Sequence, residues 1–222
     1  MLTNEVKRAC CTESFKAAYE NRYTWNHNFS GYKGKCSWTD GSREIKGSFN
    51  LGKDLKAIVN EIDDEPIKKA ISSQLWEVAI HRIRRSFEQT HGQNTFTYGD
   101  ANEIGSEIIV GGKNEGDKYR IKNDIVTMVY RHIHGNLIVI HTKEVFQTGE
   151  GYLSKSYTSQ YIDPISKKDL KEKNFYNDEF IPLKKGGPWV LSSRSIHQES
   201  SEGLILNKQT FSFSDLKSLN AS

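Results

Sequence analysis

The chain has 222 residues, 36% of them hydrophobic and 27% charged, with a formal net charge of +3 from 31 basic and 28 acidic residues. This composition is typical of a soluble globular protein. Domains that bind nucleic acid carry a stronger basic excess on one face, so nucleic acid is not a favoured partner.

Cysteine usage and apolar runs indicate a cytoplasmic protein. Cys10, Cys11 and Cys36 are odd in number and lack the spacing of a disulfide framework, which argues against an oxidising compartment. Residues 1–8 lack the apolar core of a secretory signal, and no apolar run reaches the length of about 18 residues that a transmembrane segment needs. We therefore expect a cytoplasmic location and no transmembrane segment.

The first quarter of the chain is expected to form a helix followed by a hairpin. Residues 5–20 place Phe15, Ala18 and Tyr19 on one stripe, which is typical of an amphipathic helix. An aromatic-rich connector follows. Two alternating segments are then joined at Asp40-Gly41, a strong hairpin signal, and a short third strand should follow near residues 55–59.

Residues 64–85 are expected to form a second helix. An aspartate can cap its start, and Pro66 suits the first turn, where a missing N–H costs nothing. Arg82, Arg84 and Arg85 would then lie in the last turn, where basic side chains interact favourably with the helix dipole.

After residue 90 the chain alternates apolar and polar residues between tight turns. Turn residues such as those at 123–124, 134–136 and 149–151 separate the alternating segments. This pattern predicts antiparallel strands with one wet face. We expect one α+β domain spanning 1–222: a large curved antiparallel sheet, a half-barrel of about ten strands, with two helices packed on its concave face.

Two histidines form the sharpest constellation. His132 and His134 are two apart in a predicted strand and would project together, about 6.5–7 Å apart. Imidazoles at that spacing can share a metal, with His141 approaching from the returning strand. Zinc needs a third or fourth protein ligand, however, and no nearby cysteine or carboxylate obviously supplies one. Solvated or packed histidines are the alternative.

Two further groups are candidates for binding. Arg82, Arg84 and Arg85 could hold an anionic headgroup or phosphate, or could simply be a solvated helix end. The aromatic connector could line a hydrophobic pocket or fill the core between helix and sheet. The predicted ligand-binding residues are Tyr23, Trp25, Phe29, Trp38, Phe49 and Trp76.

No complete catalytic signature is present. The serines lack a Gly-x-Ser-x-Gly elbow, and Cys10-Cys11 has no evident base beside it. The sequence names no cofactor. These observations favour a binding protein over an enzyme.

Four segments resemble an uncharacterised family. They are residues 17–25 (AAYENRYTW), 84–89 (RRSFEQ) with 91–92 (HG), 130–135 (YRHIHG) and 148–152 (TGEGY). The chain is similar over nearly its whole length to a domain-of-unknown-function family of cyanobacteria and plastid-bearing eukaryotes. The resemblance implies a photosynthetic organism and brings no reaction with it.

The expected architecture also resembles the lipoprotein-carrier (LolA-like) fold, in which a curved half-barrel shelters acyl chains beneath helices. Fold alone does not carry function. We expect a non-enzymatic carrier of a hydrophobic ligand (a lipid, isoprenoid or pigment) in a photosynthetic cell. The alternatives are an assembly or scaffold factor of the photosynthetic apparatus that binds a protein partner, and a metal-dependent enzyme using His132 and His134.

Overall fold

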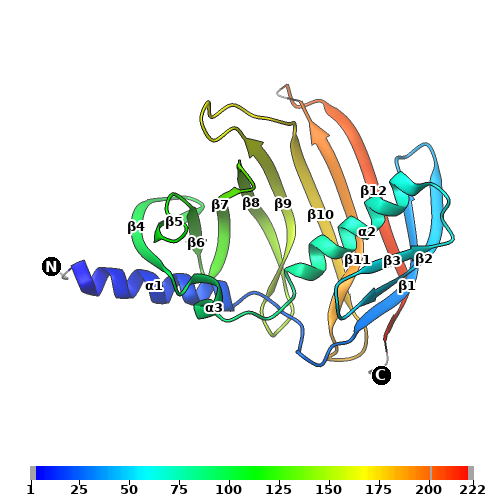
Figure 1. Cartoon of the computed structure of the whole chain (residues 1–222), viewed down its shortest axis with the longest axis horizontal. Helices are drawn as coiled ribbons and strands as arrows, with labels where there is room; N and C mark the ends of the chain where they lie inside the picture. Colours follow the sequence, from blue (N-terminus) through cyan, green and yellow to red (C-terminus); the bar gives the residue numbers. More distant parts are fainter. Residues whose placement is uncertain (1–3, 201, 220–222) are drawn as a thin grey trace. The chain divides into compact units, whose positions relative to one another are not determined.

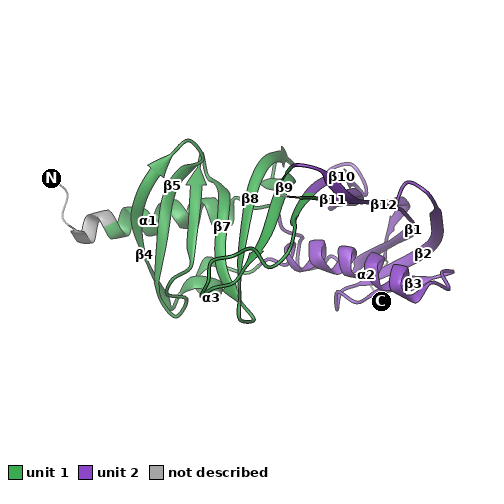
Figure 2. Cartoon of the chain, turned by 90° about the horizontal axis from the view of Figure 1, so that it is seen from above, with its two compact units in different colours: residues 1–23, 85–175, 199–202 green, residues 24–84, 176–198, 203–222 purple. Residues whose placement is uncertain are grey.

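The computed structural model describes residues 4–200 and 202–219, with side chains from residue 8 onward. In this part of the chain, twelve strands and three helices follow one another as labelled in Figure 1. They form two compact units, shown in different colours in Figure 2. Unit 1 comprises residues 1–23, 85–175 and 199–202, and unit 2 comprises residues 24–84, 176–198 and 203–222.

Unit 1 is a meander with two helices. Its elements are α1 (Asn4–Glu20), α3 (Phe87–His91), β4 (Asn94–Asn102), β5 (Gly105–Gly112), β6 (Lys118–Lys122), β7 (Ile125–Ile133), β8 (Asn136–Gln147) and β9 (Tyr152–Ile162). Successive strands from β4 to β9 pair antiparallel. Asn123 and Asp124 both adopt positive φ between β6 and β7, the backbone that a tight hairpin turn requires. The turn signals of the sequence therefore mark the hairpins.

The core of unit 1 lies where α1 meets the sheet. The predicted stripe of α1 is buried, with Phe15 and Ala18 fully excluded from solvent. Phe15 and Tyr19 pack with Phe87 of α3 and with residues of β4, β5 and β6. The helical periodicity of the sequence thus correctly predicted which face of α1 is buried.

Unit 2 brings together the early strands and the last strands of the chain. Its elements are β1 (Gly31–Thr39), β2 (Glu44–Gly52), β3 (Ala57–Asn60), α2 (Glu65–Ile80), most of β10 (Lys173–Pro182), β11 (Trp189–Glu199) and β12 (Ile205–Ser218). The strand order is β3-β2-β1-β12-β11-β10. Strand β12 pairs antiparallel with β1, so the end of the chain completes the sheet that its beginning started.

Helix α2 starts as predicted but ends earlier. The Asp64 carboxylate accepts a hydrogen bond from the Ile67 amide at 3.1 Å, and Pro66 lies in the first turn. The helix ends at Ile80, where the amides of His81 and Arg82 bond to the carbonyls of Val78 and Ala79 in a tighter turn. The prediction that a last helical turn holds Arg82, Arg84 and Arg85 is therefore wrong, because these arginines follow the helix.

The predicted α+β class, with antiparallel strands and helices packed on them, is confirmed. The short helix α3 adds to the two helices expected. That residues 1–222 behave as one domain stays a prediction. Within the described residues, no helix combines the length and the apolar character needed to cross a membrane.

Candidate functional site

Helix α2 crosses one face of the unit 2 sheet. At β3, the Ser72 hydroxyl donates a hydrogen bond to the Ala57 carbonyl at 3.1 Å. Further along the helix, Gln74 and Glu77 contact Arg194 on β11. The strand order places β2, β1 and β12 between these two attachments. Ile71 and Leu75 of the helix are fully buried, so α2 covers the inner face of these strands.

A chain of aromatic rings lies in this unit. The ring centroids of Trp25 and Phe29 are 4.8 Å apart, and those of Phe29 and Tyr32 are 6.4 Å apart. Tyr32 and Phe213 each lie 5.4 Å from Phe49. Phe29 is half-buried and the other four rings are buried. These rings pack on one another as one aromatic cluster within unit 2.

Polar contacts position two buried tryptophans of unit 2, Trp25 and Trp38. The Trp25 indole N–H donates to the Trp189 carbonyl at 2.9 Å, and its backbone amide donates to the Arg82 carbonyl at 2.7 Å. The Trp38 indole N–H donates to the Gln209 side-chain oxygen at 3.0 Å. Buried indoles need such partners, and here the partners fix where each ring lies.

A buried arginine on β11 connects α2 to the sheet. The Arg194 guanidinium donates to both carboxylate oxygens of Asp178 on β10, at 2.8 and 2.7 Å. Each of these side chains is only 2% exposed. The same guanidinium donates to Gln74 at 3.0 Å and Glu77 at 3.2 Å on α2. Directional, charge-assisted hydrogen bonds therefore fix the position of the helix over the sheet.

The buried phenol of Tyr32 lies in the field of these arginines. Burial raises the pKa of Tyr32 above its usual value, and Arg82 and Arg194 partly oppose that rise. Tyr32 is thus a neutral hydrogen-bonding group at physiological pH. The inner face of unit 2 therefore combines aromatic rings with the buried ion pair of Arg194 and Asp178.

The remaining predicted ligand residues lie elsewhere. The Trp76 side chain on α2 is 49% exposed. Tyr23 is buried but belongs to unit 1, where its amide donates to the Tyr152 carbonyl at 2.9 Å. Of the six predicted residues, five are therefore in unit 2. Their role in ligand binding stays a prediction.

The predicted anion-binding arginines have separate surroundings. The Arg82 guanidinium lies over the Phe180 ring, 5.5 Å from its centroid. Arg84 donates to the Thr24 hydroxyl at 3.1 Å, and Arg85 is exposed in unit 1. Arg82 and Arg84 thus belong to unit 2 and Arg85 to unit 1, and all three follow the end of α2. Their role in anion binding stays a prediction.

His132 is paired with a buried carboxylate. Asp117, 4% exposed at its side chain, lies 3.2 Å from His132 Nδ1 and also accepts from the His132 amide at 2.9 Å. Arg131 contacts the same carboxylate at 3.2 Å. His134 lies in the turn after β7 with φ of 49°. Among the described residues, no three histidine, cysteine or acidic side chains group as metal ligands; metal binding by His132 and His134 stays a prediction.

Sequence reasoning missed the anchor of α2. Arg194 stands at a buried position of β11, between apolar neighbours such as Leu191 and half-buried Ile196. An arginine at such a position signals a buried partner, because an isolated buried charge is very unfavourable. The partner itself could not be read from the sequence, since Asp178 and Glu77 belong to other elements.

A family model described as "Protein of unknown function (DUF3386)" matches residues 6–219. The chain belongs to this family. The expectation of an uncharacterised family is confirmed, whereas the photosynthetic source stays a prediction. No curated protein matches the DUF3386 chain by sequence.

Several solved structures are similar to this DUF3386 protein at low identity. A DUF1329 family protein from Desulfovibrio piger is 12% identical, with a TM-score of 0.29, over 97% of this chain and 95% of the other. A LolA superfamily protein from Nitrosomonas europaea is 8% identical, with a TM-score of 0.37, over 96% and 94%. The second belongs to the superfamily that the expected architecture resembles. At these TM-scores neither similarity carries a conclusion about function.

Proposed function

We propose that this protein is a non-enzymatic binding protein that carries a hydrophobic molecule between α2 and the inner face of the unit 2 sheet. The ligand class is that expected from the sequence: a lipid, isoprenoid or pigment. The proposal includes a cytoplasmic location in a photosynthetic cell.

The observation that carries the proposal is the way α2 lies over the aromatic rings. The helix is hydrogen-bonded to β3 and to β11, and the rings of Tyr32, Phe49 and Phe213 belong to β1, β2 and β12, which lie between those two strands in the sheet order. Hydrogen bonds and ion pairs can exchange with water when a helix shifts, and the aromatic surface then becomes available to an apolar ligand. The polar attachments would close again over the ligand and restore the covered state.

Native mass spectrometry of the untagged protein, purified from its own type of host, tests the proposal first. A bound ligand adds mass that organic extraction removes. The refolded or extracted protein should then take up the neutral probe N-phenyl-1-naphthylamine. All four tryptophans, Trp25, Trp38, Trp76 and Trp189, lie in unit 2, so their fluorescence reports on this unit alone.

Phe29→Ala is the informative variant, because this half-buried ring can be removed with less effect on folding than its buried neighbours. Probe affinity should fall about tenfold, the loss of roughly 1.4 kcal/mol of apolar burial. Tyr98→Ala in unit 1 is the matched control, since it removes a ring that is 42% exposed. A bare mass together with no probe uptake would refute a carrier role.

A protein-binding role is the second candidate, and a specific surface favours it. Leu204, Ile205 and Leu206 are consecutive, and each is more than half exposed, at 61%, 63% and 55%. Consecutive exposed apolar residues are uncommon on soluble proteins unless they contact something. Replacing Ile205 and Leu206 by serine should remove a co-purifying protein while leaving probe uptake unchanged. Reduced probe uptake with no loss of a co-purifying protein would instead favour the carrier role.

A further inference from the structure

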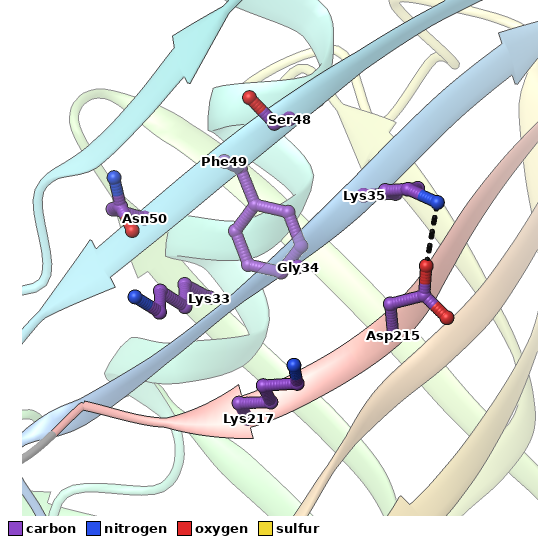
Figure 3. A pocket seen from close by; sticks show the side chains of 8 residues that line it. All are labelled: Lys33, Gly34, Lys35, Ser48, Phe49, Asn50, Asp215 and Lys217. Atoms are coloured by element: carbon purple, nitrogen blue, oxygen red, sulfur yellow. Dashed lines mark ion pairs between the residues drawn. The ribbon is translucent and has the colours of Figure 1, made fainter.

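The outer face of unit 2 carries a hollow lined by lysines. Side chains alternate between the two faces of a strand. Tyr32 and Phe49 point to the inner face that α2 covers, so Lys33 and Asn50 point to the outer one. The hollow has a volume of about 430 Å³. Figure 3 shows its lining residues, Lys33, Gly34, Lys35, Ser48, Phe49, Asn50, Asp215 and Lys217.

Strand register arranges the polar residues in two rows. In one row, Lys33 lies opposite Asn50 of β2 on one side and opposite Lys217 of β12 on the other. In the next row, Lys35 lies between Ser48 and Ser214. Directly opposed residues have Cβ atoms about 4.5–5.5 Å apart. The Lys33 and Lys217 ammonium groups can therefore converge on one bound group.

This pairing of lysines is unfavourable in the free protein. Like charges directly opposite each other destabilise a sheet. Lys35 has a partner, since its ammonium lies 2.7 Å from the Asp215 carboxylate. Within the described residues, neither Lys33 nor Lys217 forms an ion pair. Three lysines and one aspartate leave the hollow with a net charge of +2.

The Asp215 carboxylate responds to this positive field. Its hydrogen bond to Lys35 and the charge of Lys35 lower the pKa of Asp215, and Lys217 lowers it further. Asp215 is thus an anion at neutral pH that occupies part of the cationic surface. Its removal should leave more positive charge for an external anion.

A β-bulge shapes the hollow. Between the pairs Lys33–Lys217 and Lys35–Ser214, β12 has one residue more than β1. Asp215 takes φ of 51° there. Opposite the bulge, a Cβ on Gly34 would lie 2.5 Å from the Ser214 carbonyl oxygen, so only glycine fits. Bulges redirect side chains and are often found beside functional sites.

We propose that this hollow binds the phosphate group of an anionic ligand, with Lys33 and Lys217 as its two cations and Asn50 and Ser48 as hydrogen-bond donors. Lysine is a point-charge phosphate ligand with three donors. The site lies on the face opposite α2, and it stands whether or not a hydrophobic ligand binds beneath that helix.

Titration with inorganic phosphate at constant ionic strength tests the site directly, followed by amide NMR shifts in β1, β2 and β12. The double variant Lys33→Gln/Lys217→Gln should weaken binding at least tenfold. Its control is Lys46→Gln, an exposed lysine of β2 whose ammonium lies 2.9 Å from Glu44. This control should bind phosphate like the parent protein.

Asp215→Asn gives the opposite expectation. Asparagine tolerates positive φ, so the bulge should persist. Loss of the carboxylate raises the net charge of the hollow from +2 to +3 and releases Lys35, so binding should tighten severalfold. No phosphate-dependent shifts in the parent protein, or equal losses in the double variant and the Lys46 control, would overturn the proposal.

Two arms distinguish a free phosphate compound from a lipid headgroup. Vesicles containing phosphatidic acid are compared with vesicles of phosphatidylcholine alone in a sedimentation assay. Sedimentation with the acidic vesicles that is lost in the double variant identifies a headgroup. Phosphate binding without sedimentation identifies a soluble phosphate compound.

Discussion

Units 1 and 2 hold their helices against the sheet by different chemistry. In unit 1 the contacts are made by rings, with the Phe15 centroid 4.6 Å from Tyr119 and 5.0 Å from Phe96. His91 joins this cluster, 5.2 Å from Phe15. In unit 2, Gln74 and Glu77 of α2 accept hydrogen bonds from the guanidinium of Arg194, which is itself paired with Asp178 on β10.

The two kinds of contact differ in how strongly they depend on geometry and in how sensitive they are to a single substitution. Ring packing is stabilised by burial of apolar area, which depends little on orientation. A bidentate ion pair requires one geometry, and removing either partner leaves a buried charge. A single substitution at Arg194 therefore removes both the buried pair with Asp178 and the hydrogen bonds to Gln74 and Glu77 of α2, whereas in unit 1 the packing of α1 is divided among many rings.

The largest effect is expected from Arg194→Met. It leaves Asp178 buried without its cation, and the free energy of unfolding should fall by about 3–5 kcal/mol. Denaturant unfolding followed by tryptophan fluorescence measures this loss in unit 2. The double variant Arg194→Met/Asp178→Leu should recover most of it, because no lone charge remains. A loss below about 1 kcal/mol in the single variant would contradict the anchoring role.

The same experiment tests whether residues 1–222 form one cooperative domain. Far-UV circular dichroism reports on both units, whereas the tryptophans report on unit 2. Coincident transitions would support one domain. Separate transitions, with only the fluorescence transition shifted by Arg194→Met, would show that the units unfold independently.

Acid should weaken unit 1 through His91. Burial, together with the charges of Arg131 and Arg22, lowers the pKa of His91 from 6.5 to about 4, and Asp117 partly opposes this shift. Between pH 6.5 and pH 4 the unfolded chain takes up a proton that the folded chain does not. Stability that is complete above pH 6.5 is therefore lost as pH falls, by about 3 kcal/mol in total.

His91→Phe isolates this effect from the carboxylates that also titrate at low pH. It keeps a ring in the aromatic cluster and removes the ionisable nitrogen. The stability difference between parent and variant should change with pH between 4 and 6.5 and be constant above it. Parallel pH profiles would exclude His91 as the acid-sensitive group.

Helix caps should have the smallest effects, of similar size in both units. Asp64 caps α2, and Ser86 caps α3 in a capping box with Gln89. Asp64→Ala and Ser86→Ala should each lower the free energy of unfolding by about 1 kcal/mol. Chemical denaturation measures both. A much larger loss at Asp64 would mean that the start of α2, as well as Arg194, fixes this helix.

Local patterns in the sequence predicted local structure well. The buried stripe of α1, the capped start of α2 and the turn at residues 123–124 all depend on residues close in the chain. The early end of α2 was missed, because the basic segment after Ile80 continues a helix-compatible composition. Its tighter final turn and the Trp25 amide bonded to Arg82 are not visible in that composition.

Contacts between residues far apart in the chain could not be predicted from sequence patterns. Arg194 is 16 residues from Asp178 and more than a hundred from Glu77 and Gln74. Lys33 meets Lys217 only because β12 pairs with β1 in one register. Similarly, His132 was read with His134, whereas its partner in the structure is Asp117.

By itself, the sequence determined the class of the fold, its antiparallel strands, the start of each long helix and the family. Period and turn chemistry encode these features within a few residues. The tertiary structure decided which side chains meet: the aromatic rings beside α2, the anchor at Arg194 and the lysine hollow opposite. Strand order and register set these meetings, because a shift of one residue would send every side chain of a strand to the other face.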